Sequence, residues 1–217
     1  MSPRRRDIRA QRMQIAQLAA RLLVEGSTHS FGTAKRKAAA AMAVTANEDL
    51  PDNLTLLAAV IDYQQLFDRS ALALRNERLR RAALSAMHFL QNFAPRLHGA
   101  CLYGTTFRYS AVDLHLFEDE VEQVTRHLIN HRVQYQLGDA LHSVGKQAPT
   151  RFPTFALHRE GVDFELTLLP RARFKQPLIN PLNAAPYRYL DAAQLGALLT
   201  QNPGGYCLEG LHLDRLE

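Results

Sequence analysis

The spacing of apolar residues changes once along this chain, at Pro95, and that change limits the fold more than any other feature. Before Pro95, apolar side chains recur at helical intervals. After it, short segments alternate apolar and polar residues, as strands do. We therefore expect an α+β protein with an N-terminal helical unit followed by a mixed sheet flanked by helices. We place a basic helical region over residues 1–70 and an α+β domain over residues 71–217.

Four helices are predicted before Pro95, and the fourth carries a set of arginines on the side we expect to face water. The predicted helices cover approximately residues 7–25, 32–44, 51–67 and 70–93. Gly26 stops the first helix, and Ala94-Pro95 ends the fourth, because proline disfavours a helical residue before it. The arginines expected to point outward are Arg75, Arg78, Arg80 and Arg81.

After Pro95 the pattern predicts six short extended segments and two helices. The extended segments are residues 97–103, 111–117, 133–137, 141–144, 151–159 and 162–169, and the helices are residues 118–131 and approximately 191–199. Glu160-Gly161 between the last two segments is a hairpin signal. The first segment contains Cys101, which we interpret as a core residue, and ends at Gly104.

Composition excludes several classes of protein. The chain has 217 residues, of which 47% are apolar and 22% charged, so it can bury a core and is not a disordered or fibrous protein. No apolar run approaches the ~20 residues that span a bilayer, and no apolar signal-peptide core follows the basic start. The two cysteines show no metal-binding or disulfide spacing. These features predict a cytoplasmic protein without a membrane contact.

The positive charge is concentrated at one end. The net charge is +5, and residues 1–50 hold nine Lys and Arg against four Asp and Glu, which accounts for the whole excess. One interpretation is that this region contacts RNA or another polyanion. The other is that it is simply a solvated helix face.

Acidic residues alternate with apolar ones in two of the predicted strands. Asp113 and His115 share one face of the first strand, and Asp163, Glu165 and Thr167 share one face of the second. If these strands are neighbours, Asp113 and Glu165 face a common point.

A glycine turn precedes the first of these strands. Two carboxylates beside the turn Gly104-Thr105 would suit phosphoryl transfer, because Mg²⁺ takes one or two carboxylates plus substrate phosphates. The N–H groups and hydroxyls of the turn can contact those phosphates. Two ions would stabilise the attacking and leaving oxygens.

Over residues 75–170 this arrangement resembles the nucleotidyltransferase superfamily of the DNA polymerase β type, especially its minimal members. The resemblance places Gly104-Thr105 at the family's Gly-Ser turn, where the nucleotide binds, and Asp113 at its first metal-binding acid. Glu165, with Asp163 as the alternative, stands at the third acid. It implies a nucleotidyltransferase-like sheet and Mg²⁺-dependent transfer of a nucleoside monophosphate from an NTP to an acceptor that the sequence does not specify.

His115 departs from this pattern, because it occupies the position of the second metal-binding acid. A neutral imidazole adds no negative charge and is a poor ligand for Mg²⁺. His115 is then an auxiliary ligand or an orienting group in an active enzyme. Alternatively, the protein is a catalytically degenerate nucleotide- or RNA-binding module, or a generic α+β domain in which Asp113 lies in a turn or salt bridge.

Overall fold

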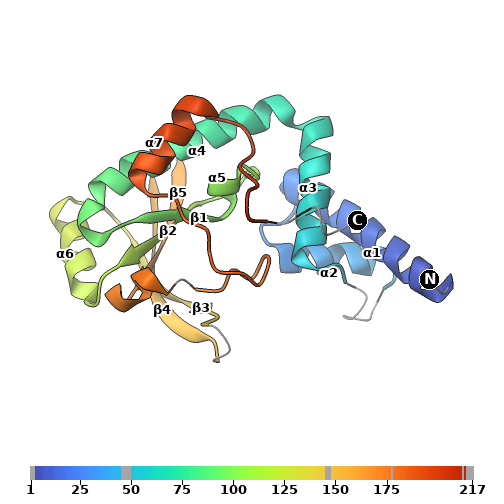
Figure 1. The fold of residues 1–217 in the computed structure, drawn as a ribbon, viewed down its shortest axis with the longest axis horizontal. Coiled ribbons are helices and arrows are strands. Elements are labelled where there is room, and N and C mark those ends of the chain that lie inside the picture. Colours follow the sequence, from blue (N-terminus) through green and yellow to red (C-terminus); the bar gives the residue numbers. More distant parts are fainter. Residues whose placement is uncertain (1–2, 45–49, 145–147, 177, 212, 214–217) are drawn as a thin grey trace. The chain divides into compact units, whose positions relative to one another are not determined.

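A computed structural model describes residues 3–44, 50–144, 148–176, 178–211 and 213. The chain forms two compact units (Figure 1). The first comprises Met1–Leu72, Phe107–Tyr109 and Leu208–Glu217, and the second Ala73–Thr106 and Ser110–Cys207. N-terminal helices precede a five-stranded mixed sheet with interspersed helices, which confirms the predicted α+β class. Before the first strand, the described residues form helices and loops only.

Three helices build the first unit, and alanines allow them to pack closely. They are α1 (Pro3–Val24), α2 (Phe31–Ala41) and α3 (Asn53–Phe67). The buried alanines are Ala16, Ala19 and Ala20 of α1, Ala34, Ala38 and Ala39 of α2, and Ala59 of α3. Ser30 caps α2 by accepting a hydrogen bond from the Thr33 N–H, and Asp52 caps α3 in the same way. The alanine-rich faces of α1 and α2 are therefore packing surfaces between the helices.

The sheet of the second unit has the strand order β1-β2-β5-β4-β3. Its strands are β1 (Arg96–His98), β2 (Val112–Phe117), β3 (Gln136–His142), β4 (Thr150–Arg159) and β5 (Val162–Leu169). The β2–β5 pair is parallel and the other pairs are antiparallel. The hairpin at Glu160-Gly161 joins β4 to β5 as predicted. The two strands expected at 133–137 and 141–144 are instead the single strand β3.

The other elements of the second unit are helical. They are α4 (Arg69–Phe89), whose first residues belong to the first unit, η2 (Gln91–Phe93), α5 (Gly99–Tyr103), α6 (Val121–Asn130), η3 (Arg171–Lys175) and α7 (Ala192–Gln201). The expected strand at 97–103 is wrong beyond His98, because α5 begins at Gly99. Cys101 is nevertheless buried, as expected, and burial raises the pKa of its thiol to about 12.

The two faces of the sheet differ in chemistry. Leu114 of β2 and Leu166 of β5 are register partners, and both are fully buried on one face. The residues that alternate with them, including Asp113 and Glu165, lie on the other face. A register shift of one residue would exchange the faces, so burial of the leucines fixes the position of the acids.

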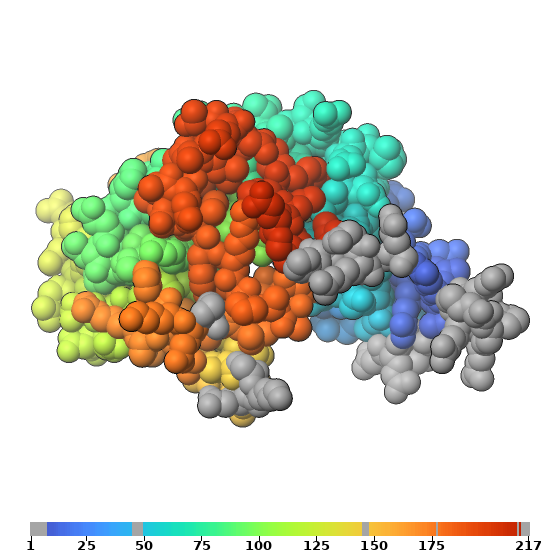
Figure 2. Space-filling view, in the orientation of Figure 1, coloured from blue at the N-terminus to red at the C-terminus, as the bar shows by residue number. Residues whose placement is uncertain are grey.

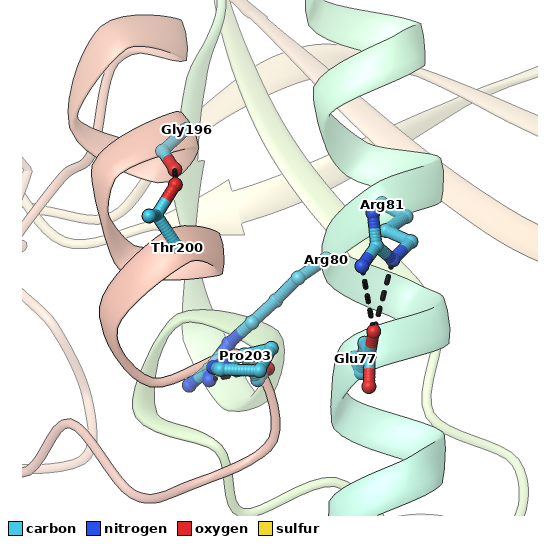
Figure 3. Close-up of polar contacts among 6 residues, drawn as sticks. All are labelled: Glu77, Arg80, Arg81, Gly196, Thr200 and Pro203. Atoms are coloured by element: carbon cyan, nitrogen blue, oxygen red, sulfur yellow. Dashed lines mark hydrogen bonds and ion pairs between the residues drawn. The ribbon is translucent and has the colours of Figure 1, made fainter.

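Arg80 contradicts the expectation that it points outward. It is fully buried and donates hydrogen bonds to the carbonyls of Cys101, Leu102, Asn202 and Pro203. These carbonyls lie in α5 and just after α7, where helix ends leave acceptors unsatisfied, and a guanidinium has five donors. Figure 3 shows Arg80 reaching from α4 toward Pro203, whereas Arg81 pairs with Glu77 on the helix surface.

Candidate functional site

Asp113 and Glu165 lie side by side on parallel strands. They are direct register partners of β2 and β5, and neighbouring strands lie about 4.8 Å apart. Their side chains therefore leave the same face of the sheet at the same level, which confirms the predicted adjacency. Asp163, the alternative third acid, is engaged elsewhere: its Oδ1 lies 2.6 Å from His158 Nδ1 on β4.

The glycine beside Asp113 is Gly99, which the sequence reasoning missed. Gly99 follows β1 directly and has φ +71°, a conformation that favours glycine. A Cβ added to Gly99 would lie 2.6 Å from Asp113 Oδ2. The carboxylate therefore rests against the bare backbone at the end of β1, and any side chain at residue 99 would displace it.

Gly104 and Thr105, expected at the nucleotide, lie at the opposite end of α5. At about 1.5 Å per residue, the helix separates Gly104 from Gly99 by about 7.5 Å. Gly104 has φ +74°, and a Cβ there would lie 2.5 Å from the Gly205 carbonyl oxygen. Thr105 is 4% exposed. Both residues are therefore tightly packed in the interior. The predicted strand over residues 97–103 would have placed them at a strand end, but β1 already ends at His98.

His115 lies beneath a segment that crosses the polar face of the sheet, residues 178–190, which we call the strap. The strap is orange in Figure 2. His115 is fully buried, and its Nδ1 shares a 2.9 Å hydrogen bond with the hydroxyl of Tyr189. The ring of Tyr187 lies 5.2 Å from that of His115. His115 is therefore a packed side chain between β2 and the strap.

Two further histidines adjoin His115. The His98 ring from β1 lies 3.9 Å from that of His115, and the His142 ring from β3 lies 5.5 Å from it. The Nε2 atoms of all three are buried without a hydrogen-bond partner among the described residues. Leaving such atoms unsatisfied costs about 1–3 kcal/mol each. No local sequence pattern indicates this cluster, because its members come from three strands.

Burial sets the charge states in this region. Burial, with His142 nearby, lowers the pKa of His98 to about 3, and burial with the neighbouring histidines lowers the pKa of His115 well below its usual value. Burial and the adjacent Glu165 raise the pKa of Asp113 to about 7. At neutral pH these two imidazoles are neutral, so they do not repel a cation that approaches Asp113 and Glu165.

The pair fits one Mg²⁺ ion that is completed by ligands from a substrate. In the described part of the chain, no three His, Cys, Asp or Glu side chains are placed to hold a metal ion together. Mg²⁺ does not require such a set, because it usually keeps several waters and takes one or two carboxylates plus phosphate oxygens. Asp113 and Glu165 supply that number. A second ion would lack a further carboxylate on β2, because the residue that shares a face with Asp113 is His115.

Glu165 also borders an open groove of about 800 Å³. The groove continues past Ala111 and along Tyr135, which follows α6, to the exposed pair His158–Asp163. Asp113 is not part of its lining. The two carboxylates are thus neighbours in the sheet, but only Glu165 opens into this groove.

Basic residues of the N-terminal region make internal contacts within the first unit. Lys35 Nζ donates to the Pro51 carbonyl and to Asn53 Oδ1, and Lys37 Nζ donates to the Ser27 carbonyl. Arg21 pairs with Glu25 at 2.9 Å. These three of the nine cations support the helices, which favours the interpretation as structural or solvated charge. Contact with a polyanion stays a prediction for the others.

Compared with models of known protein families and with curated proteins, this sequence matches none. Among the described residues, no helix is long and apolar enough to cross a bilayer.

Proposed function

We propose that this protein binds a Mg²⁺–nucleoside triphosphate complex through Asp113 and Glu165, as a nucleotidyltransferase-like module with a single cation site. The observation that carries the proposal is the register of β2 and β5, which sets two carboxylates side by side on one face of the sheet. The resemblance noted over residues 75–170 supports the choice of ligand.

The electrostatics of the pair support a bound cation. Burial raises the pKa of Asp113 to about 7, and repulsion by the neighbouring carboxylate of Glu165 adds to this effect. A divalent cation between the two groups would reverse this effect. Phosphate oxygens of the nucleotide would then complete the coordination of the ion.

The surroundings of His115 favour binding over efficient catalysis. The two-ion mechanism needs ligands for both ions, and His115 is fully buried, neutral and hydrogen-bonded to Tyr189. Nucleotidyl transfer with one ion is the second candidate. The groove of about 800 Å³ beside Glu165 favours it, because an acceptor has room there.

A thermal-shift screen tests the proposal. ATP, GTP, CTP and UTP are each added with and without Mg²⁺, and the melting temperature is measured. At 100 times the dissociation constant, binding adds about 2.7 kcal/mol of stability, which raises the melting temperature of a chain this size by about 5–10 °C. We expect such a rise only when Mg²⁺ and a triphosphate are both present.

The second candidate has its own readout. Pyrophosphate release from the triphosphate that binds, measured with amines, hydroxyl compounds and RNA as acceptors, separates transfer from binding. If none of the four triphosphates shifts the melting temperature in Mg²⁺, the proposed function is wrong.

A further inference from the structure

A second cavity lies on the face of the sheet opposite to the carboxylate pair. It has a volume of about 290 Å³ and is lined mainly by α4, α6, β4 and β5 of the second unit. A cavity of about 150 Å³ lined by apolar side chains can accommodate benzene. This cavity is therefore large enough for a small organic molecule.

Small side chains on α4 create the space. Ala82, Ser85 and Ala86 line the cavity at successive turns of the helix, where larger residues would fill it. The opposite wall includes Leu166 and Leu128, both fully buried, so the interior is apolar. Ser85 is exposed and marks the side that opens to solvent.

One basic side chain lies at the wall of this cavity. Arg159 on β4 contributes to the lining, as does its neighbour Glu160 in the hairpin turn. Their charged groups are 3.7 Å apart, and the Arg159 side chain is 58% exposed against 85% for Glu160. A pair this exposed is weak, so the guanidinium can exchange partners. Of the two, Glu160 extends further into water, which leaves Arg159 as the group nearer to a ligand.

We propose that this cavity binds a small amphipathic carboxylate. The apolar tail lies between α4 and the sheet, against Ala86 and Leu166, and the carboxylate pairs with the guanidinium of Arg159. A planar guanidinium binds a carboxylate through two parallel hydrogen bonds, which selects this head group over a hydroxyl. Pockets of this kind combine an apolar lining with a few placed polar groups.

Octanoate, octanol and octylamine are the probes, because they share one alkyl chain and differ in the head group. Binding to the full chain is measured by calorimetry and by the shift in melting temperature, without Mg²⁺ or nucleotide. We expect octanoate to bind at least about tenfold more tightly than octanol, and octylamine to bind no better than octanol. No binding of octanoate, or tighter binding of octylamine, overturns the proposal.

Two pairs of variants locate the site. Ser85→Phe fills the cavity from its open side and should abolish octanoate binding, whereas His88→Phe, on an exposed position of α4 outside the lining, should not. Arg159→Gln should remove the preference for octanoate over octanol, whereas Arg151→Gln, exposed on the same strand, should keep it. Binding that survives Ser85→Phe, or a preference that survives Arg159→Gln, refutes the assignment.

Discussion

Replacing Asp113 with asparagine should change the stability of the sheet in a way that depends on pH. The Asp113 carboxyl has a pKa of about 7 in the folded protein, against 3.8 for the unfolded chain. The folded state therefore binds more protons than the unfolded state between these values, and wild-type stability rises as the pH falls. Asparagine does not titrate. The difference between the two proteins reports Asp113 together with its coupling to Glu165, because the other titrating groups are common to both.

The two pKa values fix the size of the effect. Between pH 8 and pH 5, the wild type should gain about 2.5 kcal/mol of stability relative to Asp113→Asn. Asp113 keeps part of its surface in water, and screening reduces the gain, so we expect a value between about 1 and 2.5 kcal/mol. Asparagine should be the more favourable residue at pH 8, where the wild-type carboxylate is ionised beside Glu165.

Hydrogen exchange measured by mass spectrometry reads this effect locally. Peptides that cover β2 and β5 report the free energy of opening of the sheet itself, independently of the first unit. The measurement is made for both proteins at several pH values, with exchange times corrected for the intrinsic rate. If the difference in opening free energy between the two proteins stays constant from pH 8 to pH 5, the pKa of Asp113 is not raised by burial and Glu165. That result would refute the prediction.

Three further substitutions test the packing around the site. Arg80→Met should cost about 3–5 kcal/mol in urea unfolding because it removes the donor from four carbonyls, two of them in buried contacts, whereas Arg81→Met should cost less than about 0.5 kcal/mol. His115→Asp should lower the melting temperature because it buries a third carboxylate, and Mg²⁺ should restore part of the loss, which differential scanning fluorimetry measures. Gly99→Ala should destabilise the protein by about 2 kcal/mol or more and weaken Mg²⁺ binding measured by calorimetry, because its Cβ meets Asp113.

Sequence parity placed each of the two acids on the correct face of its strand. Asp113 and Glu165 each alternate with apolar residues that must be buried, and this requirement fixes their face and their register. The change of periodicity at Pro95 likewise separated the helical region from the sheet. Both predictions rest on local patterns. Such patterns repeat along a helix or a strand because its apolar residues must be buried.

The sequence reasoning failed where long-range contacts decide the structure. A short apolar run such as residues 97–103 fits a strand and a helix equally well, so the sequence does not reveal the turn at Gly99. Arg80 is buried because carbonyls from residues 101–102 and 202–203 surround it. No local pattern shows such partners.

The covering of His115 by the strap also cannot be predicted from the sequence. The strap is rich in proline and has no helical or strand period, yet its Tyr187 and Tyr189 cover His115. The sequence places His115 two residues after Asp113, but only the fold shows that its ring is packed beneath another segment. The interpretation of His115 as a metal ligand therefore could not be tested from sequence.

Calorimetric titration with the Mg²⁺–triphosphate complex that gives the largest thermal shift tests the central claim most directly. The wild type is compared with Glu165→Gln and with Asp163→Asn, which removes the same charge two residues away on the same face of β5. The account predicts at least about tenfold weaker binding for Glu165→Gln, equivalent to about 1.4 kcal/mol, and nearly unchanged binding for Asp163→Asn. Equal losses in both variants, or wild-type affinity in Glu165→Gln, would contradict it.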